Sequence, residues 1–163
     1  MNRKAETKMR RVIDALGDNW MVRTSDNGVG HNGFKWEAIG EWTEAPDWST
    51  SAVCSGGLFG QGPGGYGFAK QGTRFEFCET GPSRVVVDNN KVKVKLAKIL
   101  WIDADAFAAM VYAAKREFPG SLDLSGCDLK GITLPTSVGG SLDLRGCDLK
   151  CITLPTSVGS YLD

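Results

Sequence analysis

Residues that commonly catalyse reactions are few in this sequence, and no local signature surrounds them. The chain has one histidine, His31, and five cysteines. A nucleophilic pair of Cys54, or of a serine, with His31 is conceivable from composition alone. A small enzyme acting on a nucleotide or a protein side chain would have to use Glu76, Glu79 or Cys54, with the glycine-rich segment as a lid. We assign no catalytic residue and favour binding over catalysis.

Motifs for metals and cofactors are incomplete. Cys147 and Cys151 would supply half of a zinc site, but no second pair follows and His31 is distant in the sequence. Two segments, 28–33 and 60–65, match G-x-G-x-x-G, yet neither is followed by a helix as a dinucleotide site requires. An odd number of cysteines argues against a disulfide framework. The sequence therefore predicts no metal and no cofactor.

The clearest pattern is an ungapped repeat of twenty residues. Residues 120–139 and 140–159 differ at two positions only, and a third copy begins after them. Self-similarity at a fixed period is typical of stacked coils. A finer step of five residues within each copy places Leu122 over Leu142. We predict a short β-solenoid over residues 120–163, which resembles both the pentapeptide-repeat and the short bacterial leucine-rich solenoids.

Stacking of these coils has two consequences. Asp123, Asp143 and Asp163 would form a ladder of like charges along one face. The last coil would expose Tyr161 and Leu162 on a rim available for edge-to-edge self-association. Two coils and the start of a third are fewer than the roughly three repeats that a solenoid needs to be stable on its own. The preceding domain should therefore cover the first coil.

Residues 1–119 predict an α+β domain with an antiparallel sheet and two helices. Apolar residues at helical spacing from Met9 to Leu16 indicate an amphipathic helix that Gly17 ends. A second helix should begin at a cap of Asp103 or Asp105 and end at Pro119. Its apolar residues, the last of which is Phe118, should form one face that packs on the core. Period-two alternation and β-branched residues predict strands at 20–24, 34–36, 73–77, 84–87, 91–96 and 99–102.

Charge is balanced, since Lys plus Arg and Asp plus Glu both number 19. This balance excludes a generally basic nucleic-acid coat and a generally acidic mimic. A local alternative is nucleic-acid binding through the basic face of the first helix and through Lys91, Lys93 and Lys95. We favour a solvated helix face and protection of an edge strand for these lysines. The charged N-terminus and the lack of a long apolar run predict no signal peptide and no membrane helix, hence a cytoplasmic protein.

Four short motifs resemble an uncharacterised domain of phage and actinobacterial proteins, over about residues 20–102. They are G-F-K-W at 33–36, A-P-D-W at 45–48, C-S-G-G-L-F-G at 54–60 and K-V-K-V at 91–94. In that family the corresponding patterns are G-F-x-W, A-P-D-W, C-G-x-G-L-H-G and G-K-V-K, and pentapeptide-like or leucine-rich repeats often follow. Phe59 stands where the family has a histidine, a departure that favours binding over turnover.

The resemblance implies a phage or prophage protein that binds a host or phage protein complex. A host-takeover factor or a counter-defence inhibitor, such as an anti-CRISPR protein, would fit this context. The glycine-rich loop and its aromatic residues would form the contact face. Exposed aromatic side chains contribute most of the energy at interfaces. The predicted partner-binding anchors are Trp36, Trp42, Trp48, Phe59 and Tyr66.

Overall fold

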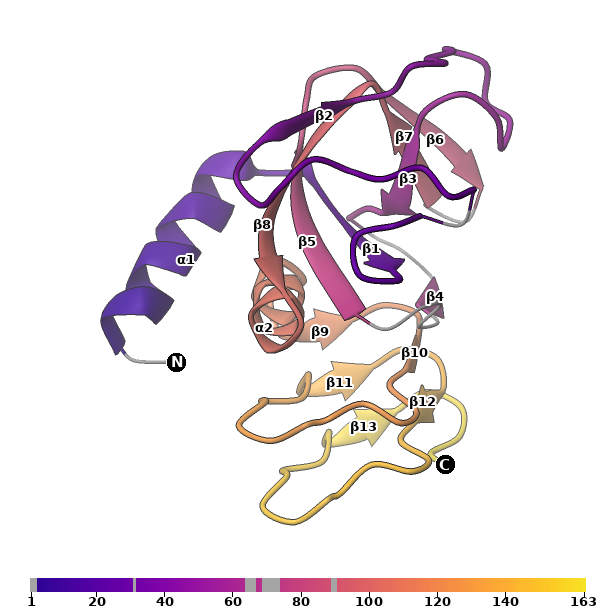
Figure 1. Cartoon of the computed structure of the whole chain (residues 1–163). Helices are drawn as coiled ribbons and strands as arrows, with labels where there is room; N and C mark the ends of the chain where they lie inside the picture. Colours follow the sequence, from indigo (N-terminus) through magenta and orange to yellow (C-terminus); the bar gives the residue numbers. More distant parts are fainter. Residues whose placement is uncertain (1–2, 31, 64–66, 69–73, 89–90) are drawn as a thin grey trace.

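The computed structural model describes residues 3–30, 32–63, 67–68, 74–88 and 91–163, which form two helices and thirteen strands (Figure 1). No helix among these residues is long and apolar enough to cross a bilayer. The elements are α1 (Arg3–Leu16), β1 (Trp20–Ser25), β2 (Trp42–Glu44), β3 (Leu58–Gln61), β4 (Gly67–Phe68), β5 (Arg74–Thr80), β6 (Arg84–Asp88), β7 (Lys91–Val94), β8 (Leu96–Ile102), α2 (Ala104–Ala113), β9 (Glu117–Phe118), β10 (Ser121–Asp123), β11 (Ser137–Val138), β12 (Leu142–Asp143) and β13 (Ser157–Val158).

Seven strands form one antiparallel sheet in the order β2-β8-β5-β1-β3-β7-β6. The prediction of an antiparallel sheet with two helices is confirmed. The central strands β1 and β5 pair over their whole length, with Val22 opposite Phe77. Both faces of these strands are covered, because Val22 and Phe77 belong to the cluster under the helices, whereas Met21 and Cys78 belong to a second cluster on the other face.

The two repeats pair with each other in parallel register. Leu122 lies opposite Leu142, as predicted, and Val138 lies opposite Val158. Strands β4 and β9 from the preceding residues pair with the first repeat in the same way, so the stack begins on the body of the protein. Figure 1 shows the repeats layered below α2 and β9. The cluster under the helices continues into the repeats and includes Phe118.

The second helix and the predicted strand at 34–36 differ from expectation. Helix α2 ends at Ala113, because Lys115 and Arg116 adopt left-handed conformations with φ of 55° and 63°. Phe118 lies instead in β9. Residues 34–36 form an isolated bridge through Lys35 and no strand, because the chain there turns back over the sheet face.

Two polar residues also take roles that alternation alone did not predict. Asp103 occupies the N-cap position of α2, but its carboxylate accepts a hydrogen bond from the Phe75 N–H at 3.3 Å and does not cap the helix. Strand β7 is an interior strand, paired with both β3 and β6, so its lysines do not protect an edge. Lys93 is fully buried, and its ammonium donates a hydrogen bond to the Ser55 carbonyl at 2.7 Å.

One difference between the repeats has a conformational cost. Gly131 and its equivalent in the second repeat, Cys151, both have positive φ, 73° and 64° respectively. A side chain at Gly131 would meet no atom within 4 Å. The left-handed conformation costs an L-residue about 1–2 kcal/mol relative to glycine. The second repeat therefore holds a strained residue where the first has none.

We expect Cys151→Gly to raise the free energy of unfolding by about 0.5–1 kcal/mol, since relief of backbone strain outweighs the greater freedom of glycine in the unfolded chain. The reciprocal substitution, Gly131→Cys, should lower it by a similar amount. Urea unfolding measures both changes. Cys151→Ala is the control, because it removes the thiol and keeps the strain. A loss of stability in Cys151→Gly would contradict the assignment.

Candidate functional site

The structure distributes the predicted aromatic anchors over three environments. Trp42 lies in β2 and is exposed over 43% of its surface. Trp36 is buried, so it does not present the exposed ring that the prediction required. Trp48 and Phe59 are half-buried. Tyr66 lies outside the described residues.

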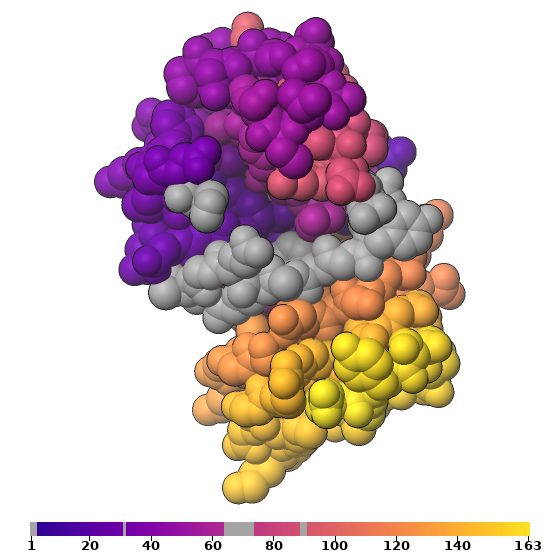
Figure 2. All heavy atoms as spheres, turned by 90° about the vertical axis from the view of Figure 1, so that its right-hand side faces the viewer, coloured from indigo at the N-terminus to yellow at the C-terminus, as the bar shows by residue number. Residues whose placement is uncertain are grey.

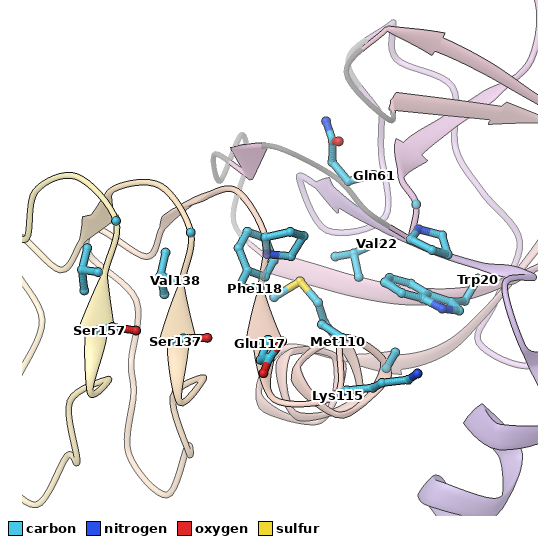
Figure 3. A pocket seen from close by; sticks show the side chains of 18 residues that line it. Trp20, Val22, Gln61, Met110, Lys115, Glu117, Phe118, Ser137, Val138 and Ser157 are labelled. Carbon is cyan, nitrogen blue, oxygen red and sulfur yellow. The ribbon is translucent and has the colours of Figure 1, made fainter.

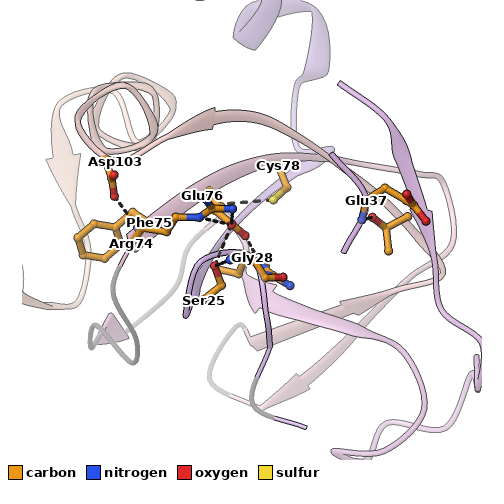
Figure 4. Close-up of polar contacts among 10 residues, drawn as sticks. Ser25, Gly28, Glu37, Arg74, Phe75, Glu76, Cys78 and Asp103 are labelled. Carbon is orange, nitrogen blue, oxygen red and sulfur yellow. Dashed lines mark hydrogen bonds and ion pairs between the residues drawn. The ribbon is translucent and has the colours of Figure 1, made fainter. Parts of the chain in front are cut away.

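Trp36 is buried because it covers a cluster of charges on the sheet. The guanidinium of Arg23 lies 3.8 Å from the centre of the Trp36 ring, a cation–π contact. Arg23 also donates hydrogen bonds to the Glu76 carboxylate and to the Gly28 carbonyl. Arg74 donates to Glu76 at 2.8 Å (Figure 4). The tryptophan thus covers Arg23, which shares the Glu76 carboxylate with Arg74.

Glu76 is saturated by these contacts. Its side chain is fully buried and accepts hydrogen bonds from Arg23, Arg74 and the Ser25 hydroxyl, the last at 2.8 Å. Burial lowers the pKa of Arg23, an effect that the Glu76 charge offsets in part. Burial and the same carboxylate raise the pKa of the Cys78 thiol, which therefore stays protonated. The cluster holds β1 and β5 in register.

The other groups considered for catalysis lie in separate places. Glu79 forms an ion pair with Lys98 at 2.8 Å. Cys54 is exposed, and its sulfur lies 3.5 Å from the Lys91 ammonium. The structure therefore does not bring Glu76, Glu79 and Cys54 together. Within the described residues, no group of three or more histidine, cysteine or carboxylate side chains is placed to hold a metal ion.

Trp36 and Phe59 line a recess of about 980 Å³ between the body and the repeats. Figure 2 shows the face that contains it. The body supplies the basic residue Lys91, whose ammonium lies 5.2 Å from the centre of the Phe59 ring. The repeats supply Asp123 and Asp143. One wall is therefore aromatic and basic, and the other is acidic.

The acidic wall belongs to the predicted ladder of aspartates. Asp123 and Asp143 lie opposite each other in parallel register. Arg145 donates hydrogen bonds to Asp143 and so lowers the pKa of that carboxyl. Ser125, the equivalent of Arg145 in the first repeat, donates its N–H and hydroxyl hydrogens to Asp123. Hydrogen bonds from Arg145 and Ser125 thus reduce the repulsion between the neighbouring carboxylates of Asp143 and Asp123.

A second hollow, a groove of about 560 Å³, runs from the sheet along the repeats. Its side chains are largely apolar, and those of Phe118 and Val138 follow one another along its floor (Figure 3). Val158 continues the row into the second repeat. Sequence analysis did not find this groove, because it is formed by residues from α2, β1, β9 and two separate repeat strands.

An exposed apolar surface outside the repeats is the β2 edge, which we define as residues 37–44. Strand β2 is one edge of the seven-stranded sheet. Ile39 and Trp42 are both exposed there. The turn before the strand is fixed by a hydrogen bond from the Gly40 N–H to the Ile99 carbonyl at 2.9 Å. The Lys98 ammonium lies 4.5 Å from the centre of the Trp42 ring.

The β2 edge is also acidic. It contains Glu37, Glu41 and Glu44 and no Lys or Arg, so its formal charge is 0 − 3 = −3. Glu44 forms an exposed ion pair with Lys95 at 3.1 Å. Glu37 and Glu41 form no ion pair with any residue that the structure describes. Sequence analysis found Trp42 but missed Ile39 and the carboxylates, although the run of three Glu around two large apolar residues is visible in the sequence.

Comparisons of the chain with family models, curated proteins and solved structures found no match. The resemblance to an uncharacterised phage and actinobacterial domain therefore stays a prediction.

The charge cluster under Trp36 gives a direct test of its structural role. Glu76→Gln leaves Arg23 and Arg74 without their carboxylate, so we expect the free energy of unfolding to fall by about 3 kcal/mol or more. Glu79→Gln, in the same strand, breaks only a half-exposed pair and should cost less than about 1 kcal/mol. Urea unfolding of both variants measures the difference. Equal stabilities of the two variants would contradict the role assigned to Glu76.

Proposed function

We propose that this protein binds another protein through the β2 edge and has no catalytic role. The observation that supports this proposal is the exposure of Trp42 and Ile39 on an edge strand whose turn is fixed against β8. Exposed aromatic residues on a rigid framework lose little entropy on binding and commonly act as hot spots. The carboxylates considered for catalysis, Glu76 and Glu79, are instead engaged in ion pairs.

The charge of the β2 edge defines the chemistry of the partner. Glu37 and Glu41 flank the two apolar side chains, and the nearby Lys95 and Lys98 form their ion pairs with Glu44 and Glu79 instead. A complementary surface would present lysine or arginine around an apolar patch. Host proteins that bind nucleic acid carry such surfaces. The acidic edge would occupy a basic site on the partner.

This chemistry agrees with the sequence resemblance. We propose that the protein is encoded by a phage or prophage, acts in the host cytoplasm and blocks a host protein complex. A host-takeover factor or a counter-defence inhibitor, such as an anti-CRISPR protein, would act in this way. Occupation of a basic, nucleic-acid-binding surface is a direct route to such inhibition, because it needs no turnover.

We further propose that residues 120–163 are a short β-solenoid that extends the surface of the body. Parallel register at a spacing of twenty residues supports this assignment. Glycine at the corners permits close stacking: a Cβ at Gly139 would lie 2.3 Å from the Pro119 carbonyl oxygen.

The β2 edge is tested by affinity capture of the partner from host lysate, followed by measurement of its affinity for purified variants. Trp42→Ala should weaken binding by at least about tenfold, because it removes the central apolar contact. Glu37→Lys/Glu41→Lys should weaken binding further at low salt, and wild-type binding should weaken as salt is raised. A photo-crosslinker at Ile39 should attach to the captured protein.

The opposite edge of the same sheet supplies the controls. Val86 and Asp88 in β6 are exposed in the same manner as Trp42 and Glu41. Val86→Ala and Asp88→Lys should change the affinity by less than about threefold. Equal loss of binding from both edges, or an unchanged affinity in Trp42→Ala, would refute the proposal.

A further inference from the structure

The backbone of β2 is hydrogen-bonded on one side only, because β2 is an outer strand of the sheet (Figure 1). It pairs with β8 in antiparallel register, with Thr43 opposite Ala97. Just after β2, the Ala45 N–H donates a hydrogen bond at 2.8 Å to the Lys95 carbonyl, which lies directly opposite in the same register. Hydrogen-bonded pairs alternate along an antiparallel ladder, so Thr43 also directs its N–H and carbonyl to β8.

Trp42 and Glu44 lie between these hydrogen-bonded positions. Their N–H and carbonyl groups therefore point away from β8, to the open side of the strand. Neither backbone forms a hydrogen bond with another segment among the residues that the structure describes. Both residues are exposed. The open side of β2 thus presents two backbone donors and two acceptors in the spacing of a strand.

The side chains of the β2 edge select which strand can be added. Trp42 and Glu44 project from the same face of β2, because alternate residues of a strand do so. A strand laid beside β2 would place its own alternate side chains next to them. Lysine or arginine would pair with the carboxylates of Glu41 and Glu44 and lie against the indole of Trp42. An acidic strand would meet three like charges within residues 37–44.

The opposite edge of the sheet has the same backbone arrangement and a different charge. The Lys95 N–H donates to the Ser83 carbonyl at 3.2 Å, in register with the pairing of β6 and β7. The same alternation turns the N–H of Val86 outward. Strand β6 contains Arg84 and Asp88, so its formal charge is 1 − 1 = 0. Charge therefore distinguishes the two edges, and a basic strand favours β2.

Given the function proposed for the β2 edge, on which this inference rests, we propose that the partner adds an extended segment rich in lysine or arginine beside β2. Backbone hydrogen bonds to Trp42 and Glu44 contribute the affinity of such strand addition, and the side chains contribute its selectivity. A partner that covers the apolar side chains with a preformed folded surface would not use these backbone groups. The two modes of binding therefore differ in a measurable way.

The probe is a peptide of about six residues that alternates lysine and valine, since this is the length of an average strand. We expect it to bind the full chain in calorimetry. Amide exchange at Trp42 and Glu44 should slow by at least about tenfold in the complex, and exchange at Val86 should stay unchanged. A peptide of the same length that alternates glutamate and valine should not bind, because its charge is repelled.

A methylated probe tests the backbone contacts without any change to the protein. The lysine–valine peptide with a methyl group on every amide nitrogen keeps its side chains and its charge but cannot donate a hydrogen bond. We expect it to bind at least about tenfold more weakly. No binding of the parent peptide, protection away from β2, or equal binding of the methylated peptide would overturn strand addition.

A proline substitution tests the same contacts from the side of the protein. Glu44→Pro removes the outward N–H and leaves the hydrogen bonds between β2 and β8 in place, a position at which edge strands accept proline. Glu44→Ala removes the same carboxylate and keeps the N–H. Glu44→Pro should bind the parent peptide at least about fivefold more weakly than Glu44→Ala. Val86→Pro is the matched control and should not change the affinity.

Urea unfolding checks that both proline variants are folded. Equal affinities of Glu44→Pro and Glu44→Ala for the peptide would contradict the proposed backbone contacts. If the captured partner still depends on Trp42 in that case, the function proposed for the β2 edge stands and strand addition alone fails. An unchanged affinity of Trp42→Ala for the captured partner would instead refute the function itself.

Discussion

The repeats depend on a neighbouring layer, because a single twenty-residue unit has no core of its own. Leu122 and Leu124 are buried only because the second repeat lies on one side of them and the body lies on the other. The body meets this requirement with β9, whose Phe118 belongs to the same cluster as Phe77 of the central sheet and Met9 of the first helix. Stability of the repeats is therefore coupled to that of the body, as in repeat proteins whose terminal units are capped.

The same requirement explains the construction of the body. The helices cover one face of β1 and β5, and residues 32–48 turn back over part of the other. Arg23 and Glu76 lie on that second face, where burial would be costly for either charge alone. Three interactions replace the lost hydration: the hydrogen bond between Arg23 and Glu76, the hydrogen bond from Arg74 to Glu76, and the cation–π contact of Arg23 with the Trp36 ring. Trp36, which the sequence predicted to be an exposed binding anchor, is therefore part of the protein interior.

Sequence patterns predicted what depends on local periodicity. The register of Leu122 on Leu142 follows from the exact repeat, and the first helix follows from the spacing of Met9 and its neighbours. Patterns failed where distant segments decide the environment. Alternation in β5 predicts that the side chains of Glu76 and Phe77 lie on different faces of the sheet, which is correct. It could not show that the face with Glu76 is buried as well. Lys93 presented the same problem, since a lysine between two valines is typical of an edge strand and yet β6 and β3 enclose it.

The composition of the β2 edge restricts the kind of partner that it can accept. The β2 edge combines Ile39 and Trp42 with Glu37 and Glu41, and two such edges would bring four carboxylates together. Like charges at close range oppose self-pairing there, whereas a basic surface would satisfy them. The β2 edge therefore favours a partner other than a second copy of this chain.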